Sequence, residues 1–150
     1  MENKKNENCA EMKEFKPLKS FGPFEFGASI AEYLEQYDVV SVPEEFDEDV
    51  NWHSYRYPGD DGRIYVENEK IVSVSVHQSA IYQGKELIGL RRDEFEKVFN
   101  VAPSGPADKI EMPSGEDQLV FEYDDISLQA WFENGRLVTI FVSKNISSEE

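Results

Sequence analysis

The chain has 150 residues, of which 39% are hydrophobic and 13% aromatic, so it has the apolar content of one folded domain and not of a disordered acidic tail. Its 31 Asp and Glu residues outnumber 15 Lys and Arg residues, and the resulting net charge of −16 repels nucleic acid and anionic lipid and favours cationic partners. Solubility alone would also account for this charge, and both interpretations stay open.

Residues 1–20 are predicted to form a flexible leader. The leader has no apolar run, so we expect neither a signal peptide nor a membrane anchor there, and we expect no membrane partner. It contains Cys9, the single cysteine, which cannot form an internal disulfide and favours a cytoplasmic location. Order is expected to begin at residue 21, with one domain over residues 21–145 and a tail over residues 146–150.

The first predicted element is a helix over residues 29–37. Its apolar residues recur at the helical spacing i, i+3, i+4 and i+7. A serine and a glutamate three residues apart match a capping box at its start. The stripe consists of Ile30, Tyr33, Leu34 and Tyr37, and the cap of Ser29 and Glu32.

An acidic loop is predicted after this helix, beginning near Pro43. It contains five carboxylates in six residues and one phenylalanine. We interpret it as an anionic loop that steers a basic protein and then docks its aromatic ring, and the alternative is a solvated loop that only aids solubility. Its residues are Glu44, Glu45, Phe46, Asp47, Glu48 and Asp49.

Three strands and then a second helix follow. The strands are predicted over residues 51–57, 63–66 and 71–76, with turns at 58–62 and 67–70. The second helix lies within residues 87–99, and a Pro- and Gly-rich loop leads from it to strands over residues 118–123, 126–133 and 136–142. The last two strands enclose Asn134–Gly135, a strong hairpin signal.

Two stretches of the chain are alike, VENEKIVSVSV at residues 66–76 and FENGRLVTIFV at residues 132–142. With the order of elements, this predicts a tandem repeat of an α-β-β-β unit, over residues 22–77 and 85–143. Arg91 takes the place of Ser29 in the second unit, so the second helix is expected to lack its cap residue. Chance resemblance of two hairpins is the alternative.

The predicted fold class is α+β, with the two repeats forming a largely antiparallel sheet and two helices packed on one face. Alternation along the strands places one apolar row toward the helices. That row contains Val72, Val74, Val76, Val138, Ile140 and Val142, joined by Ile64, Val66, Ile126, Leu128, Ala130 and Phe132.

The opposite face of the sheet is predicted to mix aromatic and small polar residues, which is typical of a binding surface because aromatic side chains dominate interface energetics. The alternative is a minor core beneath a loop or the leader. The residues on this face are Tyr65, Ser73, Ser75, His77, Gln129, Trp131, Thr139 and Phe141.

No catalytic motif is present. The two histidines, His53 and His77, form no metal-binding pair, and the GDDG segment at 59–62 lacks the spacing of a calcium loop. A solvated His77 is expected rather than a metal ligand. We therefore predict no enzyme, no catalytic residue, no metal and no cofactor.

The repeated helix-and-strand unit resembles the architecture of the β-lactamase-inhibitor-protein and outer-membrane-lipoprotein SmpA group, over about residues 22–143. The segment IYQGKELIGLRRDEF at 81–95 resembles small bacterial proteins found beside toxin genes. Neither resemblance transfers functional residues. The absence of a signal peptide and lipobox in this sequence departs from the secreted and lipoprotein members.

These features predict a cytosolic acidic binding protein, in its sharpest form an immunity protein that occludes a cationic toxin such as a nuclease. No nucleic-acid partner is expected, and the sequence leaves the oligomeric state open. The alternatives are a small-molecule-binding protein or enzyme that uses the open sheet face, and a self-associating structural domain. The predicted contact combines the acidic loop with Tyr65, His77, Gln129, Trp131 and Phe141.

Overall fold

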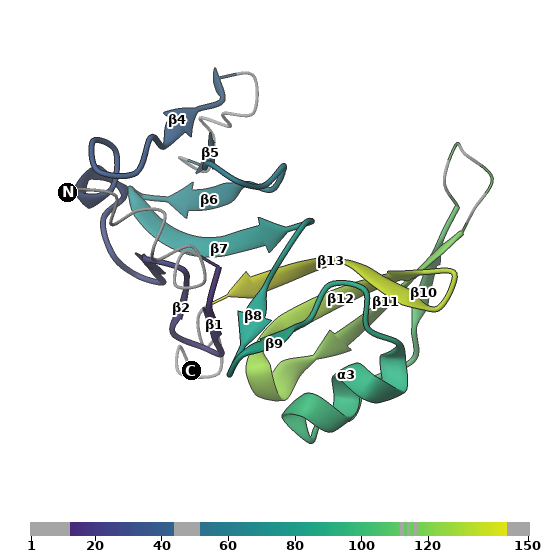
Figure 1. Ribbon diagram of the computed structural model, residues 1–150. Helices are drawn as coiled ribbons and strands as arrows, with labels where there is room; N and C mark the ends of the chain where they lie inside the picture. The colour runs from purple at the N-terminus through teal and green to yellow at the C-terminus, as the bar shows by residue number, and fades with distance from the viewer. Residues whose placement is uncertain (1–12, 44–51, 112, 114, 116, 144–150) are drawn as a thin grey trace.

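The computed structural model describes residues 13–43, 52–111, 113, 115 and 117–143. Eight strands form one antiparallel sheet (Figure 1). Across the sheet they run in the order β10 (Asp108–Ile110), β11 (Gln118–Tyr123), β12 (Leu128–Glu133), β13 (Arg136–Ser143), β7 (Lys70–Val76), β6 (Ile64–Glu67), β5 (Trp52–Arg56) and β4 (Val40–Ser41). The pairing of β13 with β7 joins the first and second halves of the chain into one sheet.

The predicted α+β class with two helices is wrong, because the structure is mostly β. The described part of the chain contains one α-helix, α3 (Arg92–Phe99). The first predicted helix is reduced to a single 3-10 turn, η1 (Ile30–Glu32). A segment of nine residues does not form a helix by propensity alone, so tertiary packing decides its conformation. Here the aromatic rings of Tyr33 and Tyr37 pack on Phe24, at centroid distances of 5.3 and 5.8 Å.

The caps of the two helical segments differ as the sequence suggested, but only in part. Ser29 Oγ accepts a hydrogen bond from the amide of Ala31 at 3.3 Å. Arg91, at the corresponding place before α3, supplies no acceptor, and instead the Glu94 carboxylate accepts a hydrogen bond from the Arg91 amide at 3.0 Å. Of the two hydrogen bonds of a capping box, α3 therefore begins with the one that the glutamate side chain accepts.

A second layer covers one face of the sheet. It contains α3, the small sheet of β1 (Phe15–Lys16), β2 (Ser20–Phe21) and β3 (Phe24–Glu25), and the hairpin of β8 (Ile81–Tyr82) and β9 (Lys85–Glu86). Residues 13–20 belong to this layer, although the leader was predicted to extend to residue 20. Phe15 is 1% exposed, and its ring lies 6.0 Å from that of Phe99 in α3.

The inner face of the sheet forms the core with this layer. Phe95 of α3 packs against Tyr123 and Phe132, at ring-centroid distances of 5.3 and 6.2 Å. Most residues of the predicted apolar row are buried in this core, and Ile126 packs against it from the 3-10 turn η3 (Asp124–Ile126). None of the described helices is long and apolar enough to cross a membrane.

Two positions of the predicted row were wrong. Val72 and Val138 are only partly buried, whereas Ile71 and Leu137 beside them are fully buried. The cause is a register shift in each hairpin, between residues 65 and 66 and between residues 131 and 132. Such an irregularity inserts an extra residue and reverses the side to which the following residues point.

The two halves use the same backbone contacts around these hairpins. The Gly27 amide donates to the Ile71 carbonyl at 2.6 Å, and the Gly89 amide donates to the Leu137 carbonyl at 2.8 Å. The amides of Ile71 and Leu137 each return a hydrogen bond to the residue after the glycine, at 2.9 and 2.8 Å. Both glycines have a positive φ, 93° and 99°, a conformation that side chains strain. Internal duplication of the chain itself stays a prediction.

Candidate functional site: the outer face of the sheet

Three aromatic side chains form a row across the outer face, which is the face opposite α3. The Tyr65 and Phe141 rings lie 6.2 Å apart with their planes inclined by 22°, and the Phe141 and Trp131 rings lie 5.9 Å apart. All three are partly exposed and lie outside the buried core cluster. We call Tyr65, Phe141 and Trp131 the aromatic row, and the sequence predicted each of them as a contact residue.

The aromatic row crosses β7 because the outward residues of that strand are small. Ser73 pairs with Tyr65 across one side of β7, and Ser75 pairs with Phe141 across the other. Residues opposite each other in antiparallel strands share a face, so the two rings extend over the serines and meet above them. Ser75 is consequently 1% exposed.

The backbone at Ser75 is held by contacts with Tyr57 and with the segment at residues 62–63. Tyr57 donates its hydroxyl hydrogen to the Ser75 carbonyl oxygen at 2.8 Å, and the Arg63 amide donates to Ser75 Oγ at 2.9 Å. A Cβ on Gly62 would lie 1.8 Å from the same carbonyl oxygen, so only glycine fits there. Burial raises the pKa of the Tyr57 phenol well above its ordinary value, which keeps the hydroxyl a donor.

Trp131 is oriented by a chain of hydrogen bonds. Its indole Nε1 donates to Gln129 Oε1 at 2.7 Å, and Gln129 Nε2 donates to Glu122 Oε2 at 2.8 Å. Gln129 was predicted as a contact residue, whereas Glu122 was not. Its place beside Gln129 follows from the register of β11 against β12, which the sequence alone does not give.

His77 lies at the edge of the aromatic row, as an exposed residue just after β7. Its Nδ1 is 3.0 Å from Thr139 Oγ1, and Thr139 is the residue paired with Trp131. The backbone amides of His77 and Gln78 both donate to the Asp60 carboxylate at 2.8 Å. Asp60 therefore acts in holding the turn against the end of β7, consistent with hairpin chemistry.

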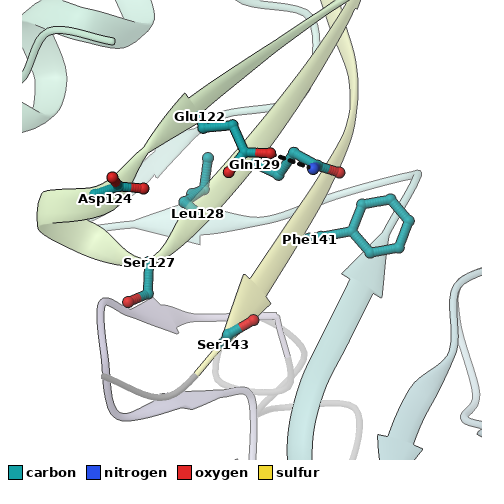
Figure 2. A pocket seen from close by; sticks show the side chains of 7 residues that line it. All are labelled: Glu122, Asp124, Ser127, Leu128, Gln129, Phe141 and Ser143. Carbon is teal, nitrogen blue, oxygen red and sulfur yellow. Dashed lines mark hydrogen bonds between the residues drawn. The ribbon is translucent and has the colours of Figure 1, made fainter. Parts of the chain in front are cut away.

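A groove adjoins the aromatic row where β11, β12 and β13 come together (Figure 2). Its volume is about 270 Å³. Glu122 and Asp124 lie along one side, and the Phe141 ring lies on the other. Glu122 and Asp124 are exposed, and Gln129 lies between Glu122 and Phe141 (Figure 2). No sequence pattern pointed to this groove, because it depends on how three strands and the turn η3 meet.

The structure thus brings together Tyr65, Gln129, Trp131 and Phe141, with His77 at their edge. The predicted acidic loop, Glu44 to Asp49 with Phe46, lies outside the described residues. No group of three or more His, Cys, Asp and Glu side chains in the described ranges has the arrangement of a metal site.

No family model, no curated protein and no solved structure matches this chain.

Proposed function

We propose that this chain is an acidic binding protein whose outer sheet face contacts a cationic protein. The observation that carries the proposal is the aromatic row, three partly exposed rings in contact with one another outside the core. Aromatic rings that are already fixed lose little conformational freedom on binding and supply large contact areas. The hydrogen bonds from Trp131 to Gln129 and on to Glu122 give the row this rigidity.

The charge of the chain selects the kind of partner. A net charge of −16 attracts cationic proteins over long distances and accelerates their association. Two exposed carboxylates, Glu122 and Asp124, lie beside the aromatic row and supply negative charge at short range. Long-range steering and a rigid aromatic contact together favour a basic protein surface as the partner.

The sharper form of this proposal is an immunity protein that neutralises a cationic toxin, such as a nuclease, in the cytoplasm. A nuclease carries basic residues to hold a phosphate backbone. An acidic protein that occupies that basic surface would block access of the nucleic acid. The weak likeness of residues 81–95 to proteins found beside toxin genes is the sequence feature that agrees with this form.

Two other functions receive less support. The groove beside the aromatic row has a volume of about 270 Å³, and a second groove, lined by residues of the N-terminal layer such as Phe15 and Tyr82, has about 320 Å³. Both volumes are at or below the lower end of the range of roughly 300 to 1,000 Å³ typical of small-molecule sites, and both grooves are open to the surface. Self-association through the aromatic row would bring together two chains that each carry a charge of −16, and mutual repulsion opposes it.

Co-expression with the product of the neighbouring gene tests the proposal. We expect that product to arrest growth and the wild-type chain to restore it, whereas a Trp131→Ala chain of equal abundance restores it poorly. The matched control is Leu119→Ala. Leu119 is an exposed apolar residue, and it lies on the face opposite the aromatic row because its strand partner Phe132 faces the core. A harmless neighbouring product would refute the immunity form, and full rescue by Trp131→Ala would refute the contact surface.

A further inference from the structure

The groove beside the aromatic row has the chemistry of a receptor for one cationic side chain. Its described lining contains two carboxylates, two serines, an amide and an aromatic ring, and no Lys, Arg or His. The ion pairs that lie wholly within the described residues, Arg92–Glu96 and Lys109–Asp117, do not use these two carboxylates. The groove therefore offers negative charge and hydrogen-bond acceptors that no such ion pair neutralises.

We propose that this groove receives an arginine side chain of the cationic partner, an inference that rests on the proposed function and assigns its contact. A planar guanidinium presents several N–H donors in one plane, which suits Glu122 and Asp124 along one side of the groove. The same plane stacks on an aromatic face such as that of Phe141. A lysine ammonium is a point charge and gains less from this combination.

The size and openness of the groove favour a single side chain. A volume of about 270 Å³ is below the range of roughly 300 to 1,000 Å³ for pockets that enclose drug-sized ligands. The groove is also continuous with the aromatic row, because Gln129 bonds to Glu122 on one side and to Trp131 on the other. An arginine in the groove and the protein surface around it would thus contact one rigid platform.

Capped hexa-arginine and hexa-lysine peptides separate this site from the general field of the protein, because the two peptides carry the same charge. Binding to the full chain is measured by nuclear magnetic resonance titration at low salt. We expect hexa-arginine to bind about tenfold more tightly than hexa-lysine, the size of one charge-assisted hydrogen-bonded contact. The shifts should centre on the Trp131 indole and the Gln129 side-chain amide.

Matched variants test whether the groove carboxylates are responsible for hexa-arginine binding. Glu122→Gln and Asp124→Asn each remove one charge in the groove, and Glu35→Gln removes one charge at an exposed position in the turn after η1. We expect each groove variant to weaken hexa-arginine binding by about fivefold to tenfold, and Glu35→Gln by less than about twofold. Thermal unfolding curves of all three should coincide with that of the wild type, because the three residues are exposed.

Equal affinity for the two peptides, no binding of hexa-arginine at millimolar concentration, or equal effects of Glu122→Gln and Glu35→Gln would each overturn the assignment of the groove. Failure of the groove and failure of the proposed function are distinguishable. If Glu122→Gln behaves like Glu35→Gln while Trp131→Ala still loses the growth rescue, only the groove is wrong. If Trp131→Ala rescues growth fully, the proposed contact face itself is wrong.

Discussion

Replacing Gly62 by alanine perturbs the backbone at Ser75, which lies beneath the aromatic row. The added methyl group would lie 1.8 Å from the carbonyl oxygen of Ser75, about half of a normal contact distance between carbon and oxygen. The methyl group cannot rotate away from a backbone oxygen, so β7 and the 59–62 turn must separate. Ser75 lies between Tyr65 and Phe141, and the aromatic row would lose its fixed spacing.

The size of the effect follows from the hydrogen bonds that converge on Ser75. They are the bond from the Tyr57 hydroxyl at 2.8 Å, the bond from the Arg63 amide to Ser75 Oγ at 2.9 Å, and the bond from the Ser75 amide to the Arg63 carbonyl at 2.8 Å. Each contributes about 1 kcal/mol net. Loss of two or three of them lowers the free energy of unfolding by about 2 to 3 kcal/mol.

Urea unfolding followed by far-UV circular dichroism measures this change. With a slope of about 2 kcal/mol per molar urea, the midpoint should fall by about 1 to 1.5 M. Gly105→Ala is the control, because a Cβ there meets no atom within 4 Å, and we expect its midpoint to stay within about 0.3 M of the wild type. A Gly62→Ala chain as stable as the Gly105→Ala chain would show that this close approach does not hold β7.

Three further predictions concern the core and its ionisation. Phe95→Ala should lower the free energy of unfolding by about 3 to 5 kcal/mol in urea titrations, because Phe95 is the one buried residue of α3, and a loss below about 1 kcal/mol would contradict the packing of α3 on the sheet. Phe15→Ala should lower it by at least about 2 kcal/mol, whereas a leader outside the core would give no change. Burial raises the pKa of Tyr57, so above about pH 10 the unfolded chain loses this proton and the folded chain keeps it. Stability therefore falls as the pH rises above that point, and in urea titrations the total loss of stability between pH 9 and 11 should be about 1.4 kcal/mol smaller for Tyr57→Phe. Equal losses for the two chains would disprove the retained proton.

Much of the sheet could be predicted from alternation and turn residues. The strands of the β6–β7 and β12–β13 hairpins were placed within one or two residues, because Asn68 and Asn134 mark tight turns between apolar runs. Both asparagines have a positive φ, 54° and 53°. The irregularity in each hairpin was not predictable. A strict period of two continues through it in the sequence, and only the pairing in the structure shows that Ile71 and Leu137 replace Val72 and Val138 in the core.

The first helix and the N-terminal layer show where local sequence signals fail. Of the predicted apolar stripe, Ile30 and Tyr33 are buried and Leu34 is exposed, and the segment packs as a turn and not as an α-helix. Phe15 stands among lysines in the sequence, so composition pointed to a leader. Its burial depends on contact with Phe99, which is distant in the sequence.

The candidate site was predictable only in part, in its aromatic residues and Gln129 but not in Glu122, Asp124 or its geometry. Alternation placed Tyr65, Trp131 and Phe141 on one face, and the structure shows them in contact. The relation of Glu122 to Trp131 through Gln129 required the register of β11 against β12. The groove required the position of η3, which the sequence indicated only as a turn.

Hydroxyl-radical footprinting of the complex with the cationic partner tests the proposed contact face most directly, because it reports the exposure of individual aromatic and leucine side chains. We predict protection of Tyr65, Trp131 and Phe141 on the outer face, with Phe99 of α3 in the opposite layer unchanged. Protection of Phe99 with an unchanged aromatic row would place the partner on the other side of the sheet and contradict the account.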